Sequence, residues 1–172
     1  MKARANIRKN TRGLDAFKKA LSRIDKDRPI VKVGLLGTKN AKRRGEALTN
    51  PELGIVHEFG TSRIPARPFL RPSVAKNAQK YEQLLAAALK KAITGETAYE
   101  KSLALIGQVA AADVKNYVTQ GAPIPPPNAP ATLRRKEALT RRGSTGSPRT
   151  LVDTGRMVGA ITYAIEKGGS EK

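Results

Sequence analysis

The chain has 172 residues, a formal net charge of +19, no cysteine and a single histidine. This composition excludes disulfides, thiolate metal sites and a histidine-rich metal site within one chain. No apolar run approaches the roughly 20 residues that span a bilayer, and no apolar segment follows the basic N-terminus, so we expect a protein made in the cytosol, with no membrane partner.

The positive charge is distributed along the chain. Ten basic residues lie between Lys2 and Arg28, four between Lys39 and Arg44, and six between Arg134 and Arg149. Such a field favours polyanions, acidic protein surfaces or anionic membranes, without choosing among them. Aromatic residues make up only 4% of the chain, so the core must consist mainly of Leu, Ile, Val and Ala.

The first third of the chain predicts a helix, a strand and a helical turn. Residues 1–13 are basic and unpatterned, and we expect them to be flexible. Apolar residues then recur at helical spacing from Leu14 to Ile24, and Pro29 ends that helix. Residues 30–37 indicate a strand, residues 38–50 an exposed basic loop, and residues 51–59 a helical turn that Asn50 caps and Gly60 ends.

The middle of the chain predicts two long antiparallel helices. The prolines at 65, 68 and 72 forbid a continuous helix over 63–72, and Ser73 can cap the helix that follows. An apolar stripe runs to Ala92, and Gly95 interrupts it. A second helix from about Glu96 reaches Tyr117, before Gly121.

Residues 121–149 have a different composition and predict an extended arm. They are rich in Pro, Gly and basic residues, with one helical stretch at 132–141. Asp153 or Thr154 can cap a short helix, and residues 161–166 indicate a strand. We therefore predict one α+β domain from residues 14–120 and 150–167, from which the arm extends, with little core of its own.

The segment HEFGTSRIPARPFLRP, residues 57–72, is the most distinctive of the chain. An enzyme that uses His57 is disfavoured, because adjacent side chains such as His57 and Glu58 point apart and no nucleophile or phosphate-loop pattern accompanies them. We expect no catalytic residue, no metal and no cofactor. A sequence-independent nucleic-acid-binding protein is the alternative function: it fits the charge but lacks a surface of interleaved aromatic and basic residues.

A stiff segment that docks on another protein explains these residue types best. Proline lowers the entropy lost on docking, and Arg and aromatic side chains are favoured interface anchors. An internal turn with both phenylalanines in the core stays open, and the two interpretations are compatible. The predicted interface residues are His57, Glu58, Phe59, Arg63, Pro65, Arg67, Pro68, Phe69, Arg71 and Pro72, with Pro125, Pro126, Arg134 and Arg135 of the arm.

The order of these motifs resembles a family of bacteriophage proteins. VKVGLLG at 31–37, HEFGTSRIPARPFLRP at 57–72, PATLRRK at 130–136, LVDTGRM at 151–157 and ITYAI at 161–165 are similar to the pattern of tail-completion and neck proteins, of the minor tail protein Z and virion-morphogenesis type. The resemblance covers about residues 30–166. The basic ends and the length of the arm are less typical.

The resemblance implies a non-enzymatic virion protein at the head–tail junction, assembled in the host cytoplasm. It implies a small, mostly antiparallel sheet packed on helices, and a homo-oligomeric ring, often hexameric. The partners it implies are ring-mates and tail-tube and neck or connector proteins, with non-specific contact to channel DNA. The charge of such a ring must be offset by DNA or acidic neighbours, so its assembly should be sensitive to salt.

Overall fold

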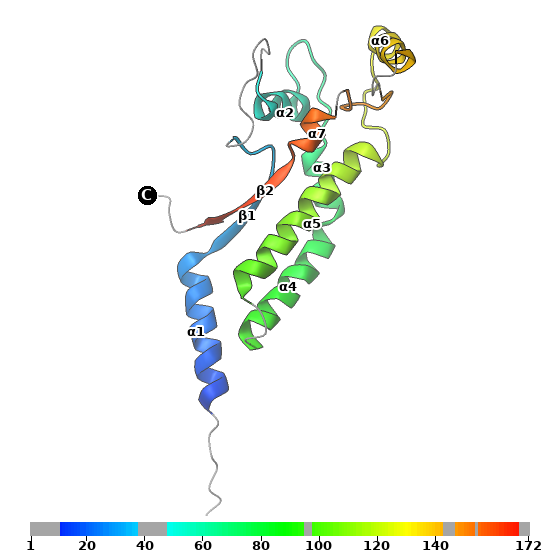
Figure 1. Ribbon diagram of the computed structural model, residues 1–172. Helices are drawn as coiled ribbons and strands as arrows, with labels where there is room; N and C mark the ends of the chain where they lie inside the picture. The colour runs from blue at the N-terminus through cyan, green and yellow to red at the C-terminus, as the bar shows by residue number, and fades with distance from the viewer. Residues whose placement is uncertain (1–10, 38–47, 95–97, 143–146, 154, 169–172) are drawn as a thin grey trace, which may run out of the picture.

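The computed structural model describes residues 11–37, 48–94, 98–142, 147–153 and 155–168 (Figure 1). Predictions for residues 1–10, for the basic loop at 38–47 and for the turn at Gly95 lie outside these ranges. The elements in chain order are α1 (Thr11–Asp27), β1 (Pro29–Gly34), α2 (Asn50–Phe59), α3 (Leu70–Lys76), α4 (Ala78–Thr94), α5 (Tyr99–Thr119), α6 (Pro130–Arg141), α7 (Arg156–Gly159) and β2 (Thr162–Lys167). The predicted α+β class is confirmed.

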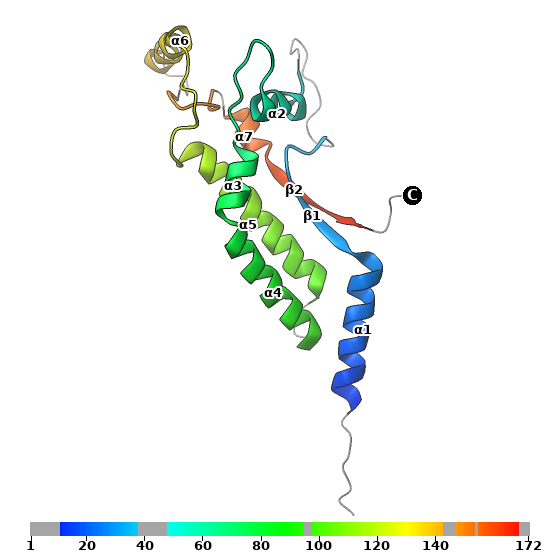
Figure 2. The same ribbon diagram turned by 180° about the vertical axis from the view of Figure 1, so that it is seen from behind.

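The sheet consists of two antiparallel strands and lies on α5 (Figure 2). β1 and β2 pair from Pro29 opposite Lys167 to Gly34 opposite Thr162. A glycine of α5 permits the close approach, because a Cβ at Gly107 would lie 2.3 Å from the ring of Tyr163. The sheet therefore joins residues far apart in sequence and fixes the two ends of the domain together.

The helix α5 is the centre of the core. Its buried residues include Leu103, Ile106, Ala110, Val114 and Val118. The first half of α5 packs on α4 and the sheet, and the second half packs on the segments around α3 and α7. Antiparallel packing of α4 on α5 confirms the predicted helix pair, but the first predicted helix is divided at Asn77 into α3 and α4.

Polar contacts reinforce that helix pair. Asp113 of α5 accepts hydrogen bonds from the Nζ of Lys80, at 2.8 Å, and from the hydroxyl of Tyr81, at 3.0 Å, both on α4.

Within the described residues, no helix combines the length and the apolar character needed to cross a bilayer.

Three predicted helix starts are wrong. Thr49, not Asn50, caps α2, and it forms a capping box with Glu52. Pro72 and Ser73 lie inside α3 rather than before it. A proline is tolerated in the first turn of a helix, because backbone N–H groups there have no carbonyl partner within the helix. The cap of α7 is Gly155, with a left-handed backbone and no side-chain hydrogen bond.

Candidate interface: the proline loop and the arm

The proline loop, residues 60–69, follows α2 and is exposed from residue 61 to 66. Gly60 ends α2 with φ +76°, and a Cβ there would lie 2.7 Å from the backbone nitrogen of Ala66. This position therefore requires glycine, because both the dihedral and the space exclude a side chain. The tight start sets the direction in which the loop leaves the helix.

A buried carboxylate holds the far end of the proline loop. Glu58 is 5% exposed. Its Oε2 accepts hydrogen bonds from the backbone N–H groups of Phe69, at 2.8 Å, and Leu70, at 3.0 Å. Its Oε1 accepts from the backbone N–H of Arg71, at 3.1 Å, and from the Nε of Arg71, at 2.9 Å.

These hydrogen bonds determine the charge state of Glu58. Burial acts to raise the pKa of its carboxyl group, but the donors at Leu70, Arg71 and Phe69 stabilise the carboxylate and lower the pKa below its ordinary value. The side chain is therefore a buried anion that ties the last turn of α2 to the first turn of α3.

The proline loop is also closed within itself. The hydroxyl oxygen of Thr61 accepts from the backbone N–H groups of Arg63 and Ile64, at 3.3 and 3.0 Å. The N–H of Thr61 donates to the carbonyl oxygen of Ile64, and the N–H of Arg67 donates to that of His57, at 2.7 Å. The loop is thus a fixed shape rather than a loose connection.

The two phenylalanines of the motif have opposite environments. Phe69 is 2% exposed and belongs to the core, whereas Phe59 is 64% exposed. The guanidinium carbon of Arg71 lies 4.8 Å from the centroid of the Phe59 ring, a cation–π geometry. The interpretation that places both phenylalanines in the core is therefore right for Phe69 and wrong for Phe59, and docking on another protein stays a prediction.

The proline loop is bonded to the arm, residues 121–149. The Nε of Arg67 donates to the carbonyl oxygen of Pro126, at 2.9 Å, and its Nη2 donates to that of Pro127, at 3.2 Å. These partners are about sixty positions apart in sequence. Two segments predicted separately as interface are therefore one continuous surface.

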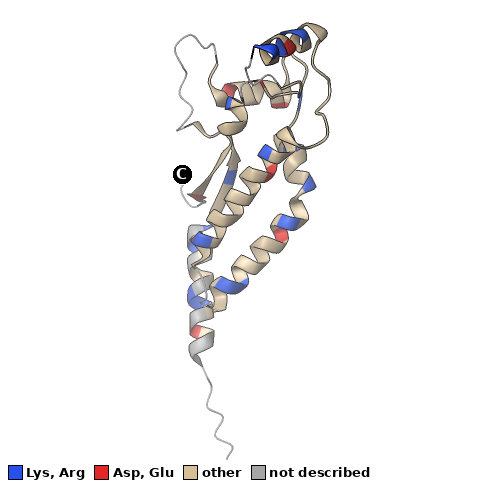
Figure 3. Cartoon of the chain, turned by 45° about the vertical axis from the view of Figure 1, so that its right-hand side comes forward, with Lys and Arg blue, Asp and Glu red and all other residues tan. Residues whose placement is uncertain are grey.

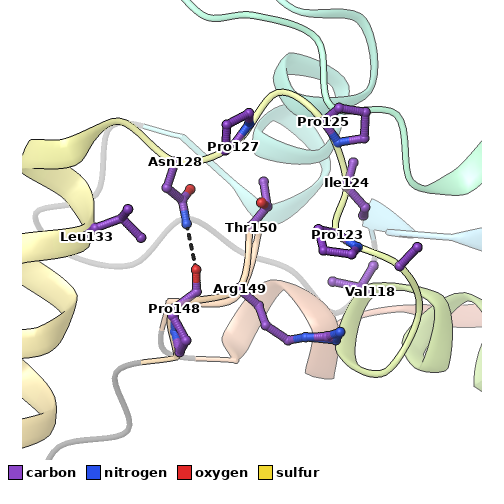
Figure 4. A pocket seen from close by; sticks show the side chains of 11 residues that line it. Val118, Pro123, Ile124, Pro125, Pro127, Asn128, Leu133, Pro148, Arg149 and Thr150 are labelled. Atoms are coloured by element: carbon purple, nitrogen blue, oxygen red, sulfur yellow. Dashed lines mark hydrogen bonds between the residues drawn. The ribbon is translucent and has the colours of Figure 1, made fainter.

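The arm, predicted to have little core of its own, contributes a residue to the main core of the domain. Ile124 is 4% exposed and packs with Phe69 and Val118 in the main core. Figure 4 shows Ile124 and Arg149 beside a pocket of about 430 Å³, and the amide of Asn128 donating to the carbonyl oxygen of Pro148, at 3.0 Å.

Arg149 fixes the other end of the arm. Its guanidinium donates to the carbonyl oxygens of Thr119 and Gly121, at the end of α5. Both ends of the arm are thus attached to the domain, and α6 lies beyond the end of α5 (Figure 1).

A pocket of about 660 Å³ lies between the proline loop, the arm and α7. Its cationic lining residues are Arg63, Arg67, Arg135, Lys136 and Arg156, and its one acidic residue is Asp153. Figure 3 shows how basic residues cover α6, which borders this pocket. The lining of this pocket therefore carries an excess of positive charge.

The most unusual residue of this pocket is Lys136. It is 4% exposed, and its Nζ donates to the carbonyl oxygens of Arg149, at 2.7 Å, and Val152, at 2.6 Å. Burial lowers the pKa of its ammonium group. Nearby, Arg135 pairs with Asp153 at 3.1 Å. These contacts bind α6 to the segment before α7.

His57 lines the same pocket. Its Nδ1 is buried with no hydrogen-bond partner among the described residues, and burial, with the charge of Arg67 adding to it, lowers the pKa of the ring. The neighbouring carboxylate of Glu58 is directed at residues 69–71 instead. Among the described residues, no group of three His, Asp or Glu side chains could hold a metal ion.

The predicted interface residues fall into two groups. Exposed residues are Phe59, Arg63, Pro65, Arg71, Pro125, Pro126, Arg134 and Arg135. Buried or half-buried residues are His57, Glu58, Arg67, Pro68, Phe69 and Pro72. Glu58 and Phe69 are buried inside the chain, so they hold the exposed residues in place and cannot themselves contact a partner.

The sequence interpretation missed three residues, Lys136, Arg149 and Asp153. Each sits in a run of charged or turn-forming residues that resembles a solvated segment. Their contacts join positions 13 to 30 apart, and no local periodicity signals them.

Comparison with known proteins finds no matching family model and no similar curated protein or solved structure.

Proposed function

We propose that this protein is a structural, non-enzymatic component of a bacteriophage particle, located at the head–tail junction. There it caps the tail tube as a homo-oligomeric ring and enables joining to the DNA-filled head. The proposal rests on the resemblance of residues 57–72 to tail-completion and neck proteins. The observation that carries it is the way this segment folds, as a braced and exposed loop bonded to the arm.

Each element of the motif has a mechanical role in that loop. Gly60 permits the turn, Glu58 closes the loop over the start of α3, and Phe69 anchors it in the core. Rigid segments lose little entropy when they dock, so a surface shaped in this way suits repeated contacts in an assembly. A symmetric ring repeats one such contact in every subunit.

The cationic pocket supports a position beside polyanions or acidic proteins. Its lining includes Arg63, Ile64 and Pro65 of the proline loop, so a partner that covers the proline loop would also meet the positive charge. We infer that acidic side chains of the tail tube or a neck protein bind there, because opposite charges steer and orient association.

Deletion of the coding sequence from the phage that carries it tests the proposal. The expected result is DNA-filled heads and separate, unjoined tails by negative-stain electron microscopy, with joining restored by the gene in trans. The variant Arg63→Ala/Arg135→Ala should fail to restore joining. Its matched control, Lys90→Ala/Lys91→Ala, removes the same charge from exposed residues of α4 and should restore it. Normal particles from the deletion would refute the proposal.

The alternative function is sequence-independent nucleic-acid binding, which the net charge and the cationic pocket favour. A mobility-shift experiment on the purified chain distinguishes the two. Tight binding to DNA of any sequence at physiological salt, weakening steeply as salt rises, would support the alternative. Weak binding in that range supports the structural role.

A further inference from the structure

The cationic pocket gathers charge from segments that are far apart in sequence. Its cations come from the proline loop (Arg63 and Arg67), from α6 (Arg135 and Lys136) and from the start of α7 (Arg156). Against these five cations, the described lining offers one carboxylate, that of Asp153. The fold, rather than a run of basic residues, therefore concentrates positive charge in one cavity.

Three of these cations form no ion pair within the described part of the chain. Arg67 and Lys136 donate to backbone carbonyl oxygens, which carry no net charge. The exposed guanidinium of Arg63 has no hydrogen-bond partner within the same ranges. Asp153 is already paired with Arg135, at 3.1 Å. The pocket thus holds positive charge that its one carboxylate does not balance.

The ionisable groups of the pocket respond to this charge. Burial lowers the pKa of His57, and the charge of Arg67 lowers it further. Burial also lowers the pKa of Lys136; Asp153 acts against this, and Arg135 and Arg67 add to it. An anion in the pocket would offset this repulsion, so the pocket favours a ligand of negative charge.

Apolar side chains share the lining with these charges. Leu48 and Ile64 line the pocket and are 42% and 39% exposed, and Leu53, Leu151 and Met157 line it as well. The described lining includes no Phe, Tyr or Trp. Proteins that hold single-stranded nucleic acid stack its bases on aromatic rings. The pocket therefore fits an apolar side chain beside a carboxylate better than it fits a nucleotide.

We propose that the cationic pocket binds a segment of a partner protein in which apolar side chains alternate with carboxylates. A carboxylate pairs with Arg63, and an apolar side chain covers Leu48 and Ile64. A second copy of this chain is disfavoured, because two copies that each carry +19 repel one another. The inference deepens the proposed function and rests on it for the source of the partner, since it states what a tail-tube or neck protein must present.

The only histidine of the chain is a direct reporter of this site, because His57 lines the pocket. The full chain is purified without a histidine tag, so that the ring of His57 gives one NMR signal. The probe is the peptide acetyl-Gly-Asp-Leu-Glu-Leu-Asp-Gly-amide. It should shift this signal until the site is saturated, and it should raise the pKa of the ring, because a nearby anion favours the imidazolium form.

Two control peptides separate charge from apolar contact. One has serine in place of both leucines, and the other has amide side chains in place of the three acidic ones. Each should bind at least about tenfold more weakly, because burying a leucine side chain is worth about that factor and opposite charges hold the register. Equal binding of the serine peptide would overturn the inference in favour of a site for any anion. Tighter binding of an oligothymidylate of about 12 nucleotides would overturn it in favour of nucleic acid. A His57 signal that no peptide shifts would overturn it as well.

Substitutions locate the contact. Arg63→Ala and Ile64→Ser should each weaken binding of the probe at least about fivefold. The matched controls are Lys90→Ala and Ile55→Ser, which change exposed residues outside the pocket and should alter the affinity by less than about twofold. Equal losses in the controls would show that the probe binds elsewhere. Circular dichroism checks that each variant is folded.

These measurements need no phage partner, so they are independent of the deletion experiment. A chain that ignores the probe would refute the inference while leaving a role at the head–tail junction open. Specific binding of the probe by a protein whose deletion leaves particles normal would refute that role alone.

Discussion

Replacing Glu58 by glutamine tests whether the buried carboxylate holds the proline loop in shape. The carboxylate accepts four hydrogen bonds, three of them from backbone N–H groups. A glutamine has one acceptor oxygen, so at least two donors lose their partner. Each charge-assisted bond contributes about 1.5 kcal/mol at the low end of its range, so Glu58→Gln should lower the free energy of unfolding by about 3 kcal/mol. We add nothing for the ion pair to Arg71, whose side chain is 64% exposed and screened by solvent.

Urea denaturation at several pH values measures this loss. The pKa of Glu58 is lower in the folded state, so its contribution is complete above the ordinary value of 4.5 and is lost as pH falls through the folded-state pKa. The difference between wild type and Glu58→Gln should therefore shrink below about pH 4.5. The control, Glu137→Gln on exposed α6, should change stability by less than about 0.5 kcal/mol. A loss at Glu58 below about 1 kcal/mol, or one that stays constant with pH, would refute the reasoning.

Three further predictions concern residues that support the same surface, and in each the loss of unfolding free energy is measured by urea denaturation. Phe69→Ala should lower the free energy of unfolding by about 4 kcal/mol, because the ring is buried, whereas Phe59→Ala should lower it by less than about 1 kcal/mol. Equal losses would contradict the assignment of Phe69 as the core anchor and of Phe59 as the exposed ring. Gly60→Ala should cost about 2 kcal/mol through its positive φ and the backbone clash, whereas Gly159→Ala, with no atom within 4 Å, should be neutral within about 0.5 kcal/mol. Arg149→Ala should cost about 2 kcal/mol and expose the arm to limited proteolysis, and an unchanged cleavage rate would show that the arm is held elsewhere.

The helices and strands were largely predictable because their signals are local. The spacing of Leu14, Phe17, Leu21 and Ile24 predicted α1, and β-branched residues near Val31 predicted β1. The α4–α5 pair followed from two apolar stripes. The helix start failed at Asn50 because the neighbouring Thr49 can also cap a helix. It failed at Ser73 because α3 begins at Leu70 with no side-chain cap, so no capping signal marks its start.

The candidate site was predictable in position and not in detail. The proline loop stands out by composition, but nothing local separates Phe59, which is exposed, from Phe69, which is buried. The bond from Arg67 to the arm and the burial of Lys136 depend on contacts between distant segments. Basic residues are mostly solvated, so a sequence interpretation assigns them to the surface by default.

Salt tests the contact proposed for the proline loop and the cationic pocket. Both would bind a partner of opposite charge, so added salt should weaken that association. The Debye length falls from about 10 Å at 0.1 M to about 3 Å at 1 M, so one titration over this range screens the attraction. Sedimentation of the chain with tail-tube protein should therefore show association that falls as salt rises, and an association that stays constant over the same range would show that apolar packing rather than charge holds the partner.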